Sequence, residues 1–438
     1  MNVRLSDRRR ERGFTLIELL VSLIGGLIVA MAVVALSGTA TNTFHEEARA
    51  AAAEMALRVA VDRLRGDIQR AAFMGTGNIQ SDPKVPLNPT GLRPKAPVGL
   101  AALSGLRLIQ NGSLGVTPLS SIAASSGNSF GNNFSPDALE ISGNLTSPDQ
   151  YVIKAIATTG NCQRLTLAVD SPAMWRVRQS GDPATTLANM FQPVAGQTFL
   201  VRVSDDLGRY EFFETCSAAT TSYAAGSPPV AYVDIASLNV IYTANYGFID
   251  GRLSVSPVQT VRWDVRPVTA STDPSYRGLA TDSNKYNLVR EYVDPKTGAP
   301  FVFANTKPSN PVELVAEYAV DFKVGFTVDV GDYTQPTPSS NTLSTYPIGD
   351  PANATVGAAV SSAGARPQRI RSVRVRLSTR SAMPDRAADI RLPNTDTYTL
   401  RYCVNDAGAP CTNGQRSWAR VRTVNTEVAL PNQARAFY

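Results

Sequence analysis

The sequence predicts an α+β protein, with one long N-terminal helix and a head made mainly of an antiparallel β-sheet. Residues 14–73 keep helical patterning and contain no proline. From residue 136 onwards, short strand-like segments such as 138–143 and 314–329 follow one another. The 31 glycines and 29 prolines of the 438-residue chain indicate many turns and long loops. We expect no second helix among the strands, which favours antiparallel pairing.

Residues 1–13 form a basic, polar segment in front of the apolar part of the helix. They contain five arginines and two acidic residues, so their net charge is 5 − 2 = +3. This is half of the formal net charge of +6 of the whole chain. The remaining excess is spread along the rest of the chain and produces no strong field that would attract nucleic acid. We therefore predict a separate leader at 1–13 and no nucleic-acid partner.

Residues 14–36 are long and apolar enough to cross a membrane. At 1.5 Å per residue the run is about 34 Å long, which exceeds a hydrocarbon core of about 30 Å. The arginines before it are expected to stay in the cytoplasm, so the chain after Leu36 is expected outside. The alternatives are an ordinary signal peptide cut near Ala40 and an uncut signal anchor. The run is longer than the about 7–15 apolar residues of a typical signal peptide.

Glu18 is an acidic residue near the start of this apolar run. A carboxylate in hydrocarbon is costly unless it has a partner or a function. If the chain is cut between Gly13 and Phe14, the new terminal ammonium lies about one helical turn from Glu18. It can then pair with the Glu18 of a neighbouring copy. Gly13 and Phe14 are thus candidate cleavage-site residues, and Glu18 is a candidate assembly residue.

The helix is predicted to continue to about Phe73, so that residues 14–73 form one element. Its second half should lie on the head through an apolar face at helical spacing. Arg63 and Asp67 are four residues apart and are expected to pair elsewhere on the helix surface. The predicted buried face contains Leu57, Val61, Leu64, Ile68 and Ala72.

The head is predicted to span residues 74–438. Loop insertions are expected near 76–135 and 334–368, where Gly, Ser, Asn and Pro are frequent. The segment SDDLGR at 204–209 is typical of a turn between two hairpin strands. The strands around these segments are expected to form one β-rich unit.

Four cysteines indicate disulfides in an exported protein. They are an even number and form no CxxC pair that would suggest zinc or thioredoxin-like chemistry. Their clustering favours the pairs Cys162–Cys216 and Cys403–Cys411, the second of which closes a short loop. Four buried free thiols are the alternative.

The sequence offers little material for catalysis or cofactor binding. His45 is the only histidine, and no phosphate-binding loop is present. Asp321 and Asp329 could contribute to a calcium site but lack the spacing of an EF-hand loop. Arg374 and Arg376 share one face of a strand, which is normally a solvated face. We expect no enzymatic activity, no cofactor and no metal site.

The segment GFTLIELLVSL, Gly13–Leu23, resembles the prepilin cleavage and assembly signature of type IV pilins and type II secretion pseudopilins. The resemblance implies that an inner-membrane prepilin peptidase cuts after Gly13 and N-methylates Phe14. It also implies that Glu18 pairs with the N-terminus of an adjacent subunit, and that the fold is pilin-like. The helix-kinking proline of many major pilins is missing, since no proline occurs before Pro83.

Three later segments, at 136–142, 314–329 and 418–433, resemble parts of PilW-type minor pilins. This resemblance implies a role in pilus initiation, adhesion and twitching motility, in the tip or priming complex. The implied partners are other minor and major pilins and a pilus-tip adhesin. The implied location is the inner membrane, with the head in the periplasm, and then the pilus at the cell surface. The alternatives are a J-type pseudopilin and a secreted binding protein or enzyme with an ordinary export signal.

Overall fold

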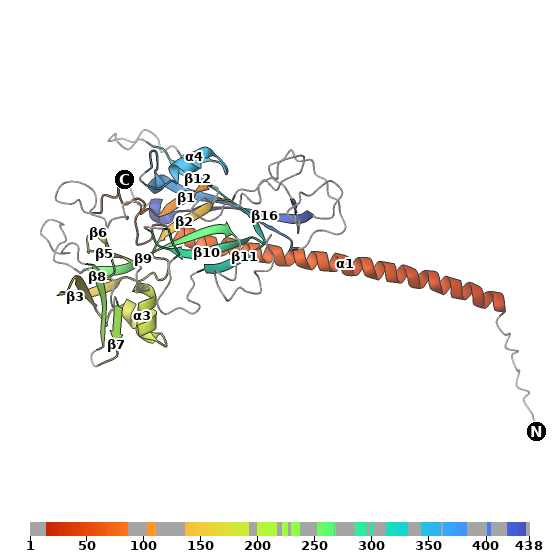
Figure 1. The fold of residues 1–438 in the computed structure, drawn as a ribbon, viewed down its shortest axis with the longest axis horizontal. Helices are drawn as coiled ribbons and strands as arrows, with labels where there is room; N and C mark the ends of the chain where they lie inside the picture. The colour runs from red at the N-terminus through yellow and green to blue at the C-terminus, as the bar shows by residue number, and fades with distance from the viewer. Residues whose placement is uncertain are drawn as a thin grey trace, which may run out of the picture. The chain divides into compact units, whose positions relative to one another are not determined.

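A computed structural model of the chain forms two compact units, Met1–Glu54 and Met55–Tyr438 (Figure 1). The first unit is helical, and the second contains the sheets. The described residues are 15–85, 103–110, 136–191, 199–216, 221–226, 229–236, 252–266, 268, 285–295, 298–300, 312–331, 343–360, 362–382, 401–403 and 418–434.

The long N-terminal helix, α1, spans Leu16–Gln69 and ends before the predicted Phe73. The chain turns sharply after it, because Ala72 and Met74 adopt positive φ angles of 59° and 48°. The Ala72 N–H donates to the carbonyl oxygen of Ser142 at 2.9 Å instead of continuing the helix. Gly143 allows this close crossing, since a Cβ atom there would lie 2.7 Å from the carbonyl oxygen of Arg70.

The larger sheet contains eleven strands among the described residues, and its pairings are antiparallel. Strands β10 and β11 extend it from the C-terminal half of β9, and β5 and β6 extend it from the N-terminal half. β9 therefore connects the strands that pair with its C-terminal half, β2 and β10, to those that pair with its N-terminal half, β3 and β5. The main path runs through β1 (Leu106–Ile109), β2 (Ala138–Gly143), β9 (Ser254–Arg266), β3 (Tyr151–Thr159), β4 (Cys162–Leu167), β8 (Val230–Ala236) and β7 (Thr221–Ala224). The added strands are β5 (Leu200–Ser204), β6 (Tyr210–Glu214), β10 (Asn287–Val293) and β11 (Val312–Glu317).

The smaller sheet has five strands among the described residues, again in antiparallel pairs. Its order is β13 (Leu343–Tyr346), β12 (Ala319–Asp329), β14 (Ile370–Arg380), β16 (Trp418–Ala429) and β15 (Arg401–Cys403). The predicted fold class is confirmed, because a long apolar N-terminal helix precedes a head of antiparallel sheets. The predicted hairpin turn at 204–209 joins β5 and β6.

The expectation of no second helix in the head was wrong, because four short α-helices and one 3-10 turn occur among the described residues. They are too short for apolar periodicity to reveal, but their starts carry capping signals. Ser171 accepts a hydrogen bond from the Met174 N–H, and Asp350 accepts one from the Ala352 N–H. Each of these elements begins with proline, which suits the first helical turn. They are α2 (Pro172–Gln179), α3 (Pro183–Phe191), α4 (Pro351–Val356), η5 (Pro367–Arg369) and α5 (Pro431–Ala434).

Both stretches expected as loop insertions contain regular structure. Part of 76–135 forms β1, and part of 334–368 forms β13 and α4. Buried Asn353 fixes α4 against the smaller sheet. Its side chain accepts from the Phe326 N–H at 3.0 Å and donates to the Pro347 carbonyl oxygen at 2.7 Å. Composition alone did not reveal these long-range bonds. The parts of the two stretches that lie outside the described residues are 86–102, 111–135, 332–342 and 361.

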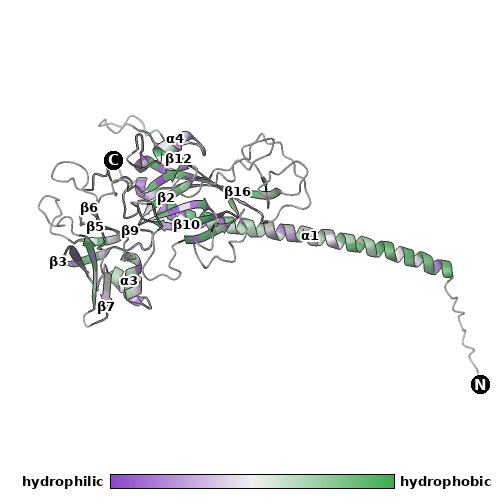
Figure 2. Ribbon diagram, viewed as in Figure 1, coloured by the Kyte–Doolittle hydropathy of each residue, from purple (hydrophilic) through white to green (hydrophobic). Residues whose placement is uncertain are grey.

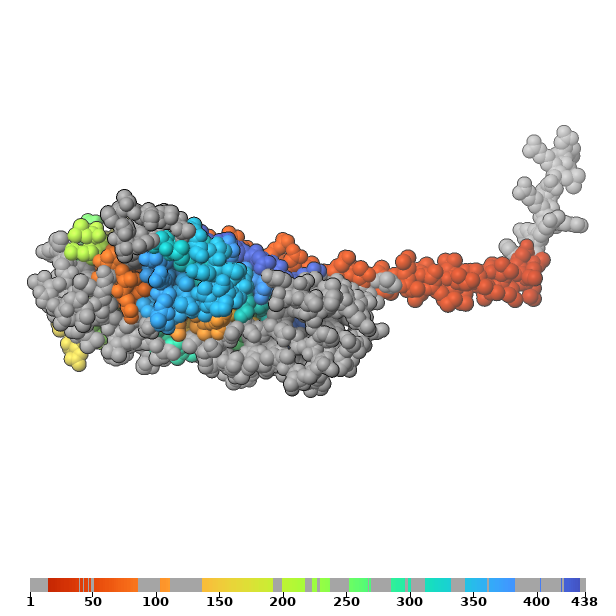
Figure 3. Space-filling view, turned by 90° about the horizontal axis from the view of Figure 1, so that it is seen from above, coloured from red at the N-terminus to blue at the C-terminus, as the bar shows by residue number. Residues whose placement is uncertain are grey.

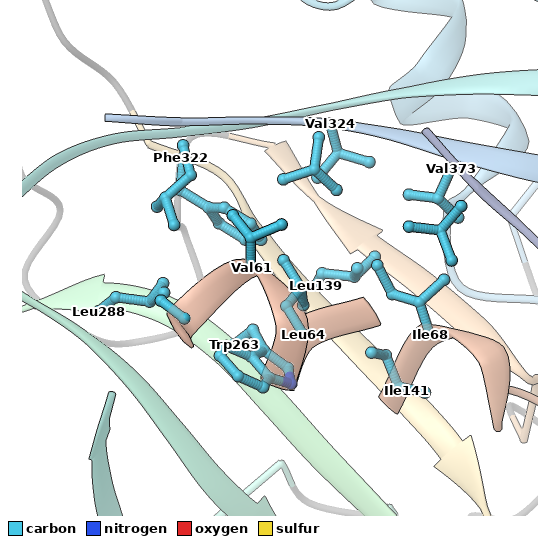
Figure 4. Close-up of a cluster of buried hydrophobic side chains, with 14 of the residues drawn as sticks. Val61, Leu64, Ile68, Leu139, Ile141, Trp263, Leu288, Phe322, Val324 and Val373 are labelled. Atoms are coloured by element: carbon cyan, nitrogen blue, oxygen red, sulfur yellow. The ribbon is translucent and has the colours of Figure 1, made fainter. Parts of the chain in front are cut away.

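The main core of the head forms around the second half of α1. Side chains of this helix pack against the larger sheet on one side and the smaller sheet on the other (Figure 4). Leu57, Val61, Leu64 and Ile68 of the predicted face are buried, while Ala72 is half-buried beyond the helix end. The sheet residues around them include Leu139, Ile141, Trp263, Leu288, Phe322, Val324 and Val373.

A second core lies in the part of the head formed by the strands β3, β4, β5, β6, β7 and β8, the start of β9, and the helices α2 and α3. We call this part the α2–α3 lobe. Its buried residues come from the strands and from both helices, and they form a cluster separate from the one around α1. The larger sheet therefore borders two cores, one around α1 and one around α2 and α3. The cluster includes Tyr151, Leu165, Met174, Phe191 and Val233.

The arginines of β14 lie in ion pairs rather than on a simply solvated face. Arg376 Nε lies 2.6 Å from Asp321 Oδ2, and Arg374 Nε lies 3.3 Å from Glu427 Oε2. Asp329 Oδ2 accepts from Arg371 Nη2 at 3.0 Å. Asp321 and Asp329, the two acids considered for a calcium site, are thus each bonded to an arginine.

Candidate functional site

The candidate site is the start of α1, where Thr15 and Glu18 form a reciprocal cap. The Thr15 N–H and the Thr15 hydroxyl both donate to Glu18 Oε2, at 3.0 Å and 2.9 Å. In return, the Glu18 N–H donates to Thr15 Oγ1 at 3.4 Å. This is a capping box, in which residues three apart satisfy each other's backbone N–H groups at a helix start.

The capping box adds a structural role to a residue that the sequence marked only for assembly. The signal was present, since threonine followed three residues later by glutamate is the pattern of such a cap. Both bonds to the Glu18 carboxylate end on Oε2. Among the described residues, Oε1 has no hydrogen-bond donor, so a cation brought by another molecule can approach it.

The helix that follows Glu18 exposes its apolar side chains to the surroundings. Every residue of α1 from Leu16 to Gly38 is exposed, and Leu16 has an exposed fraction of 82%. Figure 2 shows this part of the helix mostly in the hydrophobic colour, and Figure 3 shows its side chains in a space-filling view. Within the described residues, Leu16–His45 is the one candidate membrane span by length and composition. Such a surface needs lipid or other helices around it.

Gly13 and Phe14, the predicted cleavage and methylation residues, lie outside the described residues. Glu18 is described, and it lies in the first turn of α1, two residues after Leu16. A cut between Gly13 and Phe14 would leave Thr15 as the second residue of the mature chain. The capping box would then lie next to the new terminal ammonium.

The second half of α1 is fixed in the head by a carboxylate that sequence reasoning misplaced. Asp67 was expected on the surface with Arg63, but it is only 4% exposed. Its Oδ2 atom accepts from Trp263 Nε1 at 3.0 Å and from Arg290 Nε at 2.6 Å. Arg63 instead contacts Glu313 at 3.3 Å. The apolar spacing around Asp67 was the available signal, since Leu64 and Ile68 flank it on the buried face.

A disulfide joins Cys162 and Cys216, with their Cα atoms 6.2 Å apart. Cys162 is the first residue of β4, and Cys216 lies two residues after the end of β6. The disulfide therefore joins two positions of the α2–α3 lobe that are 54 residues apart in the sequence. Of the other predicted pair, Cys411 and the side chain of Cys403 lie outside what the structure describes.

His45 lies exposed on α1, and its ring stands beside that of Phe44 at a centroid distance of 6.2 Å. In the described ranges of the chain, no group of three or more His, Cys, Asp and Glu is arranged to hold a metal ion.

The sequence comparisons concern this same part of the chain. Residues 8–24 match the family model described as the prokaryotic N-terminal methylation motif. The matched stretch contains Gly13, Phe14 and Glu18. The comparison with curated proteins finds no match, and neither does the comparison with solved structures.

The motif supports a type IV pilin-like prepilin, of the pilin or the pseudopilin type. It implies processing by a prepilin peptidase and association with a pilin assembly machinery. The apolar helix that follows fits an anchor in the inner membrane with the head in the periplasm.

Proposed function

We propose that the chain is a PilW-type minor pilin that takes part in type IV pilus assembly. The prepilin peptidase removes residues 1–13 and methylates Phe14, and the mature protein waits in the inner membrane. It then enters the tip or priming complex with other minor and major pilins and with a pilus-tip adhesin. In this role it supports adhesion and twitching motility at the cell surface and performs no catalysis itself.

The observation that carries this proposal is the methylation motif at residues 8–24, which runs directly into α1. The motif supplies the processing site, and the exposed apolar side chains supply a surface for packing against other helices. The α2–α3 lobe adds bulk to the head. Such bulk suits an accessory subunit better than a repeating shaft subunit, because additional mass obstructs close helical packing.

Mass spectrometry of the mature chain tests the processing step. We expect an N-terminus at Phe14 that carries one methyl group. Gly13→Ala should accumulate the full-length precursor, whereas Gly38→Ala, a change further along the same helix, should be processed normally. A mature N-terminus near Thr41 would instead show an ordinary signal peptide, and would favour a secreted binding protein or enzyme.

A J-type pseudopilin of type II secretion is the second candidate, because the same motif occurs at the start of both classes. A deletion strain separates the two. Loss of pili and of twitching with normal protein export supports the minor pilin. Loss of export with intact pili supports the pseudopilin.

A further inference from the structure

Strand β3 separates from β9 after its first residues. Tyr151 and Val152 pair with β9, and the Ile153 N–H donates to the Leu253 carbonyl oxygen at 2.8 Å. From there to Thr159 the strand pairs with β4 on one side. Within the part of the chain that the structure describes, no strand pairs with its other side. The outer part of β3 is therefore an open edge of the sheet, at one margin of the head (Figure 1).

This open edge, residues 154–159, is accessible to another molecule, and we call it the β3 edge. All of its residues except Ile156 are exposed. Successive side chains of a strand point to opposite faces, so exposure along the row means that both faces are uncovered. Ile156 is half-buried because it packs against the core of the α2–α3 lobe.

The hairpin that follows β3 determines which backbone groups point outward. Thr159 pairs with Cys162 across a two-residue turn, in which Gly160 has a φ of 58°. The residues that flank such a turn bond to each other, and bonded and non-bonded pairs then alternate along the two strands. The N–H and carbonyl groups of Ile156 and Thr158 therefore point away from β4. They are the donors and acceptors that the β3 edge offers.

The β3 edge lacks the features that usually protect the outer strands of a sheet. Such strands commonly carry charges or prolines that prevent pairing with another chain. β11, which pairs only with β10 among the described strands, has Glu313 and Glu317 within six residues. The β3 edge is equally long, contains no proline, and has Lys154 at its beginning as its single charged residue. It is therefore suited to accept a further strand.

The β3 edge is complementary to itself. When two copies are placed antiparallel about a two-fold axis at Ala157, Ile156 of each copy lies opposite Thr158 of the other. These are the residues whose backbone groups point outward, so each such pair exchanges two hydrogen bonds. The two Ala157 side chains meet at the axis, where their small size lets the strands approach.

The remaining positions agree with this register. Ala155 lies opposite Thr159, an uncharged pair, and Lys154 lies opposite Gly160 of the turn. The two lysines are thus at opposite ends of the paired edges and do not face each other. Ile156 gains a β-branched neighbour from the second copy on the face that its own lobe covers only partly. A second copy of this chain therefore fits the edge in both its charge and its side-chain sizes.

We propose that two copies of this chain join through their β3 edges, with residues 154–159 of one copy antiparallel to the same residues of the other. The strands β7, β8, β4 and β3 of both copies then form one continuous sheet. Six residues bury less than the about 1,200–2,000 Å² of a stable interface, so the pair is reversible and forms where copies are concentrated, as in a membrane. The inference goes beyond the proposed function, because it needs only the head and does not depend on cleavage or entry into a filament.

Cysteine cross-linking of the full-length chain in membranes tests the register. Ala157→Cys should form a cross-linked dimer under mild oxidation, because directly opposite residues of a non-bonded pair have Cα atoms about 4.5 Å apart. Ala155→Cys is the matched control on the same face of the strand. Its two copies lie about 13 Å apart along the strands, so its dimer yield should stay at that of the wild-type chain.

The wild-type chain gives the background from the native cysteines. Equal dimer yields from Ala155→Cys and Ala157→Cys would show a contact elsewhere in the molecule and overturn the proposal. A yield from Ala157→Cys no higher than this background would overturn it as well. A cross-link of Ala157→Cys to a different protein alone would assign the edge to another partner.

A proline at the edge tests the backbone pairing. Thr158→Pro removes an outward N–H but no bond to β4, so it should lower the dimer yield of the Ala157→Cys chain several-fold. Thr158→Ala keeps the N–H and should leave the yield unchanged. Equal urea midpoints of the two variants show that the lobe is intact. An undiminished yield from the proline variant would contradict pairing through the backbone.

Discussion

Two carboxylates on one helix, Glu18 and Asp67, are held in opposite ways. Glu18 stands on an exposed apolar stretch, and its bonds come from Thr15, three residues away. Asp67 is buried in the head, and its bonds come from Trp263 and Arg290, which follow it by about two hundred residues. The hydrogen bonds of Glu18 need only one turn of helix to form. The hydrogen bonds of Asp67 form only when the whole head has folded.

The contrast shows what each half of α1 does. At Glu18 the local cap leaves one carboxylate oxygen for a partner from another molecule. At Asp67 all the bonds are made within the head, and they fix the rotation and register of the helix against β9 and β10. The proposed contacts of Glu18 thus lie between molecules, at the start of α1, whereas the contacts of Asp67 lie within the head.

The largest effect is expected at Glu18. Glu18→Ala should leave cleavage and methylation intact but abolish entry into filaments, because the ammonium of the adjacent subunit loses its countercharge. The measurement is the amount of the mature chain in sheared filaments relative to that in membranes. Thr15→Ala is the matched change, since it removes the hydroxyl of the cap but keeps the carboxylate, and it should reduce entry much less. If the Glu18→Ala variant entered filaments normally, Glu18 would have no role in contacts between molecules, and the proposed difference between Glu18 and Asp67 would be wrong.

Asp67→Ala should cost about 3–5 kcal/mol of unfolding free energy, because it leaves the buried Arg290 guanidinium without its closest carboxylate. Urea unfolding of the detergent-solubilised full chain, followed by tryptophan fluorescence, measures this loss. Asp62→Ala is the control, since Asp62 is an exposed acid on the same helix and should change the free energy by less than about 0.5 kcal/mol. Equal effects of the two changes would show that Asp67 has no special role.

The two acids also mark what could be predicted from the sequence. The apolar run, the acid within it and the buried face of α1 depend on residues close together in the chain, and these are visible in spacing and composition. The partners of Asp67 are not, because only the fold brings β9 and β10 to that turn of α1. For the same reason β10 and β13 were not foreseen. The sequence analysis predicted no strand at β10, and β13 lies in a stretch expected to be a loop insertion. Pairing with β9 and β12 makes the two segments strands.

The short helices of the head show a similar limit. α2 and α4 have caps that can be recognised from serine or aspartate followed by proline, but neither is long enough to show a periodic face. Burial in the α2–α3 lobe holds α2 in place through Met174 and Val177. Tertiary contacts rather than helix propensity therefore decide where these elements form.

The disulfide extends the comparison to covalent contacts within the head. Cys162→Ser combined with Cys216→Ser should lower the unfolding free energy by about 2–4 kcal/mol. Without the disulfide, the unfolded chain has more conformational freedom, which favours unfolding. The same urea titration measures this. The wild-type chain under a reducing agent should unfold like the double variant. An unchanged midpoint after reduction would mean that the core of the lobe alone determines its stability.

A third carboxylate, Asp264, is buried like Asp67 but less well paired. It lies on the face of β9 that points away from α1, where Arg266 Nε is 3.6 Å from its Oδ1 atom. Burial raises the pKa of Asp264 from 3.8 to about 6, although Arg266 opposes the shift. Arg262, Glu140 and Glu291 are the other charged groups that act on it.

The smallest expected effect is a pH dependence at Asp264. The folded head holds the proton of this carboxyl more tightly than the unfolded chain does, so protonation stabilises the head in mild acid. That contribution is complete below pH 3.8 and is lost as the pH rises through about 6. Between pH 5 and pH 7 the loss is about 1 kcal/mol. Asp264→Asn should remove this part of the pH dependence, which urea midpoints at the two pH values will show. A slope that persists unchanged in the variant would place the titrating group elsewhere, and Asp264 would then resemble Asp67, an acid whose charge is balanced within the fold.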